Sequence, residues 1–125
     1  AFMAVTKTTE ITKVGSLVID FDADSSVEAH VTGNSSGKLY LVDIDNTANA
    51  SSSAYLRIKD AQSAGSAGTL VPWWLFVAGP GAKASYVLSE GHSYSTGLTL
   101  WCTTSNAPEN TSSPSASVIV KLIAT

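Results

Sequence analysis

The chain has 125 residues and a formal net charge of −3, a size that suits one domain and a charge that does not favour binding to nucleic acid. Its 7 lysine and arginine residues are scattered, and no apolar run approaches the roughly 18 residues that cross a bilayer, so we expect a soluble protein with neither nucleic-acid nor membrane partners. Serine and threonine make up about a quarter of the residues, which favours short strands and turns over helices.

Residues 1–13 are predicted to form an N-terminal arm or an edge strand ahead of a sandwich domain at residues 14–125. Phe2 and Met3 lie near the chain end, and the polar stretch after them has strand propensity but poor alternation. An arm that bears two large apolar side chains can attach to a neighbouring subunit. Phe2 and Met3 are therefore candidate contact residues.

Three segments after the arm alternate between apolar and polar residues with a period of two. This pattern is typical of half-buried strands, in which one set of side chains faces the core. The expected core-facing sets are Leu17, Ile19 and Phe21; Val27, Ala29 and Val31; and Tyr40, Val42 and Ile44.

The strand predicted at residues 71–77 is apolar on both faces. One face holds Val71, Trp73, Leu75 and Val77, and the other holds Trp74 and Phe76. A strand in a two-layer protein buries only one face, so the second must be covered by a loop, by the N-terminal arm or by another chain. The preceding strand, at residues 54–58, alternates in the ordinary way.

A similar excess of apolar residues occurs in the strand predicted at residues 98–104. Leu98, Leu100 and Cys102 share one face, whereas Trp101 points to the other. Because aromatic residues are enriched at protein interfaces, Trp74, Phe76 and Trp101 are the leading candidates for partner contacts. Cover by loops or by the N-terminus of the same chain is the alternative. Cys102, the single cysteine, is expected to be a buried and inert thiol.

Turn-forming clusters separate these segments, and a last strand is predicted at residues 118–122. The pattern predicts an all-β fold with eight or nine short strands and no helices between them. We expect a single two-sheet antiparallel β-sandwich of the jelly-roll or immunoglobulin-like type.

No set of residues forms a recognisable catalytic or metal site. Asp20, Asp22 and Asp24 have the spacing that opens a calcium loop, but Ser25 replaces the required glycine and Val31 the closing glutamate. His30 and His92, the two histidines, are not in metal-ligand spacing. We therefore expect no enzyme activity, no metal and no cofactor.

The latter two-thirds of the chain contains short segments in a characteristic order. They are Ala54-Tyr55-Leu56-Arg57-Ile58-Lys59-Asp60, Gly68-Thr69 with Pro72, Leu75-Phe76-Val77-Ala78-Gly79, Tyr94-Ser95-Thr96-Gly97-Leu98, Thr103-Thr104 and a final Val/Ile strand. This layout resembles that of small structural proteins of tailed bacteriophages and prophages. The chain departs from it at Trp73-Trp74, where single aliphatic residues are usual, and at Tyr94, where phenylalanine is usual.

The resemblance implies a virion component on the capsid surface. We expect a capsid decoration (cement) protein that binds the major capsid protein or another virion protein, assembled as a small homo-oligomer with a trimer favoured. The alternative is a carbohydrate-binding or receptor-binding module of a spike or fibre, in which Trp74, Trp101 and Tyr55 form an aromatic platform for sugars.

Overall fold

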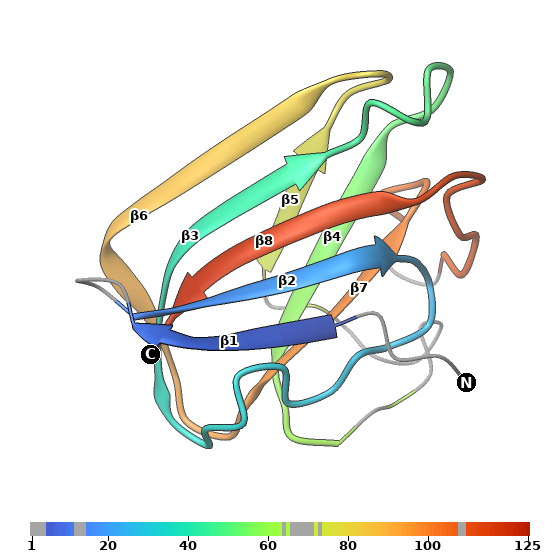
Figure 1. The fold of residues 1–125 in the computed structure, drawn as a ribbon. Helices are drawn as coiled ribbons and strands as arrows, with labels where there is room; N and C mark the ends of the chain where they lie inside the picture. The colour runs from blue at the N-terminus through green and yellow to red at the C-terminus, as the bar shows by residue number, and fades with distance from the viewer. Residues whose placement is uncertain (1–4, 12–14, 64, 66–71, 73, 108–109) are drawn as a thin grey trace.

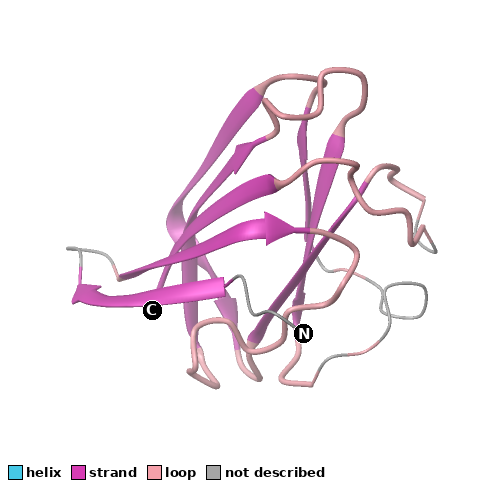
Figure 2. Cartoon of the chain, turned by 45° about the vertical axis from the view of Figure 1, so that its right-hand side comes forward, coloured by secondary structure: helices cyan, strands magenta, loops and turns pink. Residues whose placement is uncertain are grey.

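The computed structural model describes residues 5–11, 15–63, 65, 72, 74–107 and 110–125, which form two antiparallel sheets and no helix (Figure 1). The five-stranded sheet has the order β1-β2-β8-β3-β6, and the three-stranded sheet the order β5-β4-β7. The strands are β1 (Val5–Ile11), β2 (Ser16–Ala23), β3 (Gly37–Asp45), β4 (Ala54–Asp60), β5 (Trp74–Ala78), β6 (Lys83–Tyr94), β7 (Leu98–Thr103) and β8 (Val118–Ala124). The predicted all-β sandwich is confirmed, and Figure 2 shows its two layers from the side.

The strands pair in a nested order, as in a long antiparallel hairpin. β2 pairs with β8, β3 with β6, and β4 with β5, so each pair encloses the next along the chain. The segment between β2 and β3 pairs with β7 through the Glu28–Leu100 bridge, and the Val31 amide donates to the Leu98 carbonyl at 2.8 Å. This nesting is the connectivity of a jelly roll. Residues 27–31 thus make a bridge where the alternation had predicted a full strand.

The core lies between the inner faces of the two sheets. Its fully buried aliphatic side chains come from six strands, and Cys102 lies among them, as expected. Burial raises the pKa of the Cys102 thiol to about 12, with a smaller effect from the negative charges of Asp20 and Asp24. The thiol therefore stays protonated and unreactive at neutral pH.

β2 presents the opposite face to the core from the one predicted. Val18 and Asp20 are buried, whereas Phe21 is 52% exposed. The cause is the pairing with β8, in which Val18 lies opposite Leu122 and Asp20 opposite Val120. Directly opposed residues of an antiparallel pair point to the same side of the sheet, so the buried face of β8 determines that of β2.

β6 contains a bulge that bends the strand. Leu39 of β3 pairs with His92 and Leu41 pairs with Val87, so three extra residues of β6 lie between the two pairs. Gly91 in this bulge has a φ of 75°, which glycine adopts without strain. A tight turn at Gly79–Ala82 connects β5 to β6.

Candidate functional site

Strand β5 is apolar on both faces, as the sequence indicated, but its exposed face is not the one that holds the predicted contacts. Trp74 and Phe76 are half-buried and pack against the core. Leu75 and Val77 point to the outside, where they are 45% and 39% exposed. We call Leu75 and Val77 the β5 patch. These two residues, rather than Trp74 and Phe76, form the exposed apolar surface of this strand.

Trp74 and Phe76 close the edge of the sandwich between β5 and β6. The Trp74 ring stacks on His92 with a centroid distance of 5.4 Å and an interplanar angle of 12°, and Phe76 contacts Tyr86 at 5.1 Å. The Tyr86 hydroxyl donates to the Val77 carbonyl at 2.5 Å and accepts from the Val77 amide at 3.3 Å. Tyr86 thus occupies backbone groups of an edge strand that would otherwise be open to pairing with another chain.

Trp101 is completely buried and is therefore not available to a partner. It lies on the outer side of β7, opposite Arg57 of β4, which is also fully buried. The Arg57 guanidinium donates to the carbonyls of Ser105 and Ala107 at 2.5 and 2.7 Å, which fixes the chain after β7 over this side of the sheet. Trp101 is therefore covered by the chain itself, the alternative noted above.

The three aromatic residues proposed as a sugar platform do not share one surface. Trp74 faces the sandwich edge, Trp101 has no exposed surface, and Tyr55 lies on the outer side of β4 opposite Val77. A sugar-binding platform needs coplanar rings on one accessible face. The described residues therefore do not form the predicted platform.

A further apolar surface lies on the outer side of the five-stranded sheet and was not predicted. Leu17 lies opposite Ile123, Ile123 opposite Leu41, and Leu41 opposite Val87, so four aliphatic side chains form one row across four strands. We call these residues the outer row. Val87 at its end is 74% exposed. A shallow apolar hollow of about 240 Å³ lies along the row and is lined by Tyr40, Leu41, Val87, Leu88, Ser89 and Ile123.

Charged residues adjoin the outer row on one side. In the next outward-facing row, Lys121 of β8 lies opposite Asp43 of β3. One step further along, Asp45 lies opposite Lys83, and their charged groups are 3.9 Å apart. Hydrogen bonds from Thr47 are the main reason that the pKa of Asp45 is lowered. This side of the sheet thus combines an apolar row with two acidic and two basic residues.

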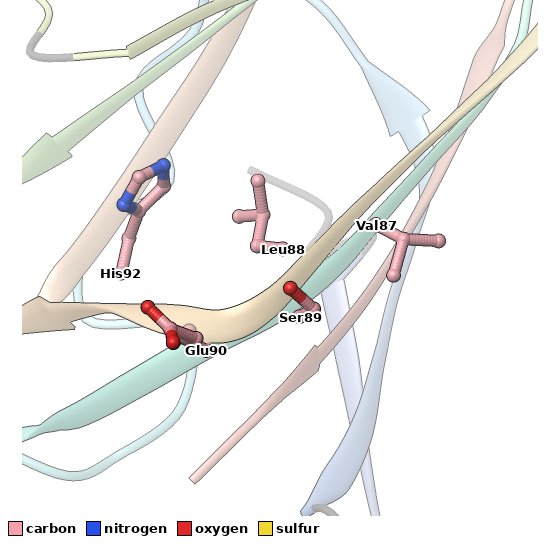
Figure 3. Close-up of a pocket in the computed structure, with 6 residues that line it drawn as sticks. Val87, Leu88, Ser89, Glu90 and His92 are labelled. Atoms are coloured by element: carbon pink, nitrogen blue, oxygen red, sulfur yellow. The ribbon is translucent and has the colours of Figure 1, made fainter.

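The β6 bulge forms a hollow of about 380 Å³ lined by residues 87–92 (Figure 3). Leu88 and His92 point to one side of the strand and Val87 points away. The lining comes from one strand, and its polar side chains Ser89, Glu90 and His92 are exposed. A single exposed strand does not provide the convergent polar groups of an enzyme site.

Asp20 is the buried carboxylate of the acidic segment considered above as a calcium loop. Burial raises its pKa from 3.8 to about 6, against a hydrogen bond from the Asp22 amide, and the negative charges of Glu28, Asp24 and Asp22 raise it further. Its Oδ2 atom has no hydrogen-bond partner among the described residues. Burial and the charge of Asp24 also raise the pKa of Glu28. No cluster that could hold a metal ion occurs in the part of the chain that was described.

Sequence reasoning could have found the outer row from β8. Ile119 and Ile123 alternate with the buried Val118, Val120 and Leu122, so this strand, like β5, has apolar residues on both faces. The predicted contacts Phe2 and Met3, and the β5-flanking Val71 and Trp73, lie outside the described residues.

Comparison of the chain with protein-family models and with curated proteins gives no match. The described residues also contain no helix long and apolar enough to cross a membrane. Functional inference therefore depends on the sequence pattern and on the surfaces described above.

Proposed function

We propose that the chain is a non-enzymatic structural protein of a bacteriophage virion, a decoration protein on the capsid surface that binds the major capsid protein. The observation that supports this proposal is the presence of exposed apolar side chains on the outer sides of both sheets, at Phe21, Val87, Leu75 and Val77. Exposed apolar groups on a small single domain are typical of proteins that work by assembly. The resemblance of the second half of the chain to phage structural proteins supplies the kind of assembly.

The β5 patch is the surface that we assign to the shell. On the outer side of the three-stranded sheet, Trp101 of β7 and Arg57 of β4 are buried, whereas Leu75 of β5 is exposed. The chain after β7 is held by hydrogen bonds to Arg57 of β4, whereas Leu75 and Val77 of β5 keep exposed side chains. An exposed apolar patch beside buried residues is the kind of surface that forms a stable interface with a larger partner protein.

Cosedimentation tests the proposal directly. Purified chain is mixed with empty shells of the major capsid protein encoded in the same phage genome and centrifuged through a sucrose cushion. We expect saturable binding at a fixed number of copies per shell. The double variant Leu75→Lys/Val77→Lys should lose binding, whereas Glu90→Gln, a change at an exposed position of β6, should retain it.

No binding to shells at concentrations up to about 100 μM would count against a decoration role. Specific hits on a glycan array in the same preparation would favour the carbohydrate-binding alternative. The separation of Tyr55, Trp74 and Trp101 in the fold argues against that outcome.

A further inference from the structure

The outer side of the five-stranded sheet carries more apolar side chains, above all in β2 and β8, than an antiparallel sheet normally presents to water. In β2 and β8 its outward-facing residues include Leu17, Ile19, Phe21, Ile119 and Ile123, all of which keep exposed or half-buried positions. Sheets with one solvated face normally alternate between apolar residues inside and polar residues outside. This side therefore has the composition of a surface that packs against another apolar surface.

The rows on this side are arranged so that they complement themselves. The outer row, Leu17–Ile123–Leu41–Val87, is apolar from end to end. The adjacent row runs Ile19–Lys121–Asp43–Ser85, with the opposite charges on the two central strands. If a second copy faces this side with its strand order reversed, its apolar row lies on the apolar row of the first copy. Each lysine of the central strands then lies on an aspartate of the other copy.

We propose that a second copy of the chain packs face to face on this side of the sheet, about a two-fold axis that runs parallel to the strands between β8 and β3. Such an axis places β8 of one copy over β3 of the other at the same height. Lys121 then faces the second copy's Asp43, Ile123 faces its Leu41, and Leu17 faces its Val87. Each contact occurs twice, as an isologous interface requires.

The charges distinguish this axis from one alternative two-fold arrangement of two such faces. An axis perpendicular to the strands, centred on the charged row, places Lys121 on Lys121 and Asp43 on Asp43. It also places the apolar Leu41 on the acidic Asp45. Like charges in close contact are unfavourable, so the charges favour the axis parallel to the strands over a perpendicular axis centred on the charged row.

The size of the face indicates a weak pair. Four strands spaced about 4.8 Å apart, each contributing about three outward residues, give a footprint of roughly 20 by 20 Å. Over both copies this is roughly 800 Å², which is smaller than standard specific interfaces and in the range of weak, transient pairs. We therefore expect dissociation in the micromolar range. This inference does not depend on attachment to a shell, and it favours a two-fold pair over the trimer.

Sedimentation velocity over about 5 to 500 μM chain tests the pair. The wild type is expected to shift from monomer to dimer across this range. Val87→Lys, at a largely exposed position at the end of the outer row, should weaken dimerisation at least tenfold. The matched control Leu75→Lys, an exposed apolar residue on the other sheet, should leave dimerisation unchanged.

A charge exchange tests whether Lys121 and Asp43 contribute to the contact between the two copies. Lys121→Glu alone and Asp43→Lys alone each place like charges opposite one another and should each weaken the dimer about tenfold or more. The double variant Lys121→Glu/Asp43→Lys restores opposite charges at both positions and should recover dimerisation to within about threefold. Circular dichroism and urea unfolding of each variant verify that the fold is intact.

The outcomes separate this inference from the proposed function. A strict monomer, a trimer, or a dimer that is insensitive to Val87→Lys would each overturn the two-fold pair. A dimer that the double exchange does not restore would overturn the parallel axis. If the Val87→Lys monomer binds shells, the decoration role stands whichever of these results is obtained. If it does not bind shells while the wild type forms the expected dimer, only the decoration role is refuted.

Discussion

The buried carboxylate of Asp20 makes the stability of this protein depend on pH. Asp20 is 1% exposed, its Oδ1 accepts a hydrogen bond from the Asp22 amide at 3.0 Å, and its Oδ2 has no partner among the described residues. The folded protein therefore disfavours the ionised form. Replacement of Asp20 by asparagine keeps the size and the Oδ1 acceptor but removes the charge.

The sign and size of the effect follow from the two pKa values. The pKa of Asp20 rises from 3.8 to about 6 on folding, mainly through burial. Below about pH 4 the side chain is protonated in both states, and its contribution to stability is fully present. As the pH rises from about 4 to 6, the unfolded chain ionises first, and about 3 kcal/mol of stability is lost. Above about pH 7 the contribution changes no further.

Asp45 and Asp60 act in the opposite direction at lower pH. Burial raises the pKa of Asp60, but hydrogen bonds from the amides of residues 95–97 and the Ser95 hydroxyl lower it more, so that the net shift is downward. Hydrogen bonds from Thr47 lower the pKa of Asp45. Stability from a lowered pKa is lost as the pH falls. We therefore expect maximal stability near pH 4.

Urea unfolding from about pH 4 to 8 measures this dependence. Asp20→Asn should equal the wild type near pH 4 and exceed it by about 2 to 3 kcal/mol near pH 7.5, with a smaller remaining slope from Glu28. Glu90→Gln is the control, because it removes the same charge from an exposed position. A wild-type stability that is flat between pH 4 and 7, or an Asp20→Asn variant with an unchanged slope, would refute the argument.

Three further predictions concern groups within the fold. Arg57→Ala should lower the free energy of urea unfolding by about 3 kcal/mol, because it leaves two loop carbonyls without their donor; an unchanged midpoint would contradict this. Cys102 should resist iodoacetamide in the native protein and react in urea, as mass spectrometry can show; rapid native alkylation would contradict its burial. Tyr86→Phe should cost about 1 kcal/mol and increase light scattering on storage through the uncapped edge at Val77, and an equally stable, non-aggregating variant would contradict the capping role.

The alternation of the sequence predicted the strands where polar and apolar residues separate cleanly. In β4, Ala54, Leu56 and Ile58 are buried as expected, and in β3 Val42 and Ile44 are buried while Asp43 and Asp45 lie on the outer side. In such strands only one face can enter the core. The period of the pattern then determines both the element and its orientation.

Orientation could not be predicted where both faces of a strand are apolar or where the buried face holds a charge. In β2 the buried face includes the charged Asp20, so the sequence pattern predicted the opposite face, with Leu17, Ile19 and Phe21, as the buried one. The pairing of β2 with β8 determines which face is buried. Trp101 is buried, and Arg57 opposite it bonds to the carbonyl of Ser105, a contact over more than 45 residues that local sequence does not reveal. These outcomes depend on tertiary contacts.

The two apolar surfaces of the protein lie on opposite sides of the sandwich and can therefore be occupied together. The outer row belongs to the five-stranded sheet, whereas the β5 patch belongs to the three-stranded sheet. A pair formed through the outer rows directs both β5 patches away from the pair interface, so each dimer presents two separate apolar patches. Two weak attachments held in one particle bind more tightly than either does alone if the shell offers sites at the matching spacing. Loss of dimerisation in Val87→Lys should then lower the apparent affinity for shells without abolishing binding, whereas Leu75→Lys/Val77→Lys should abolish binding and leave the dimer intact.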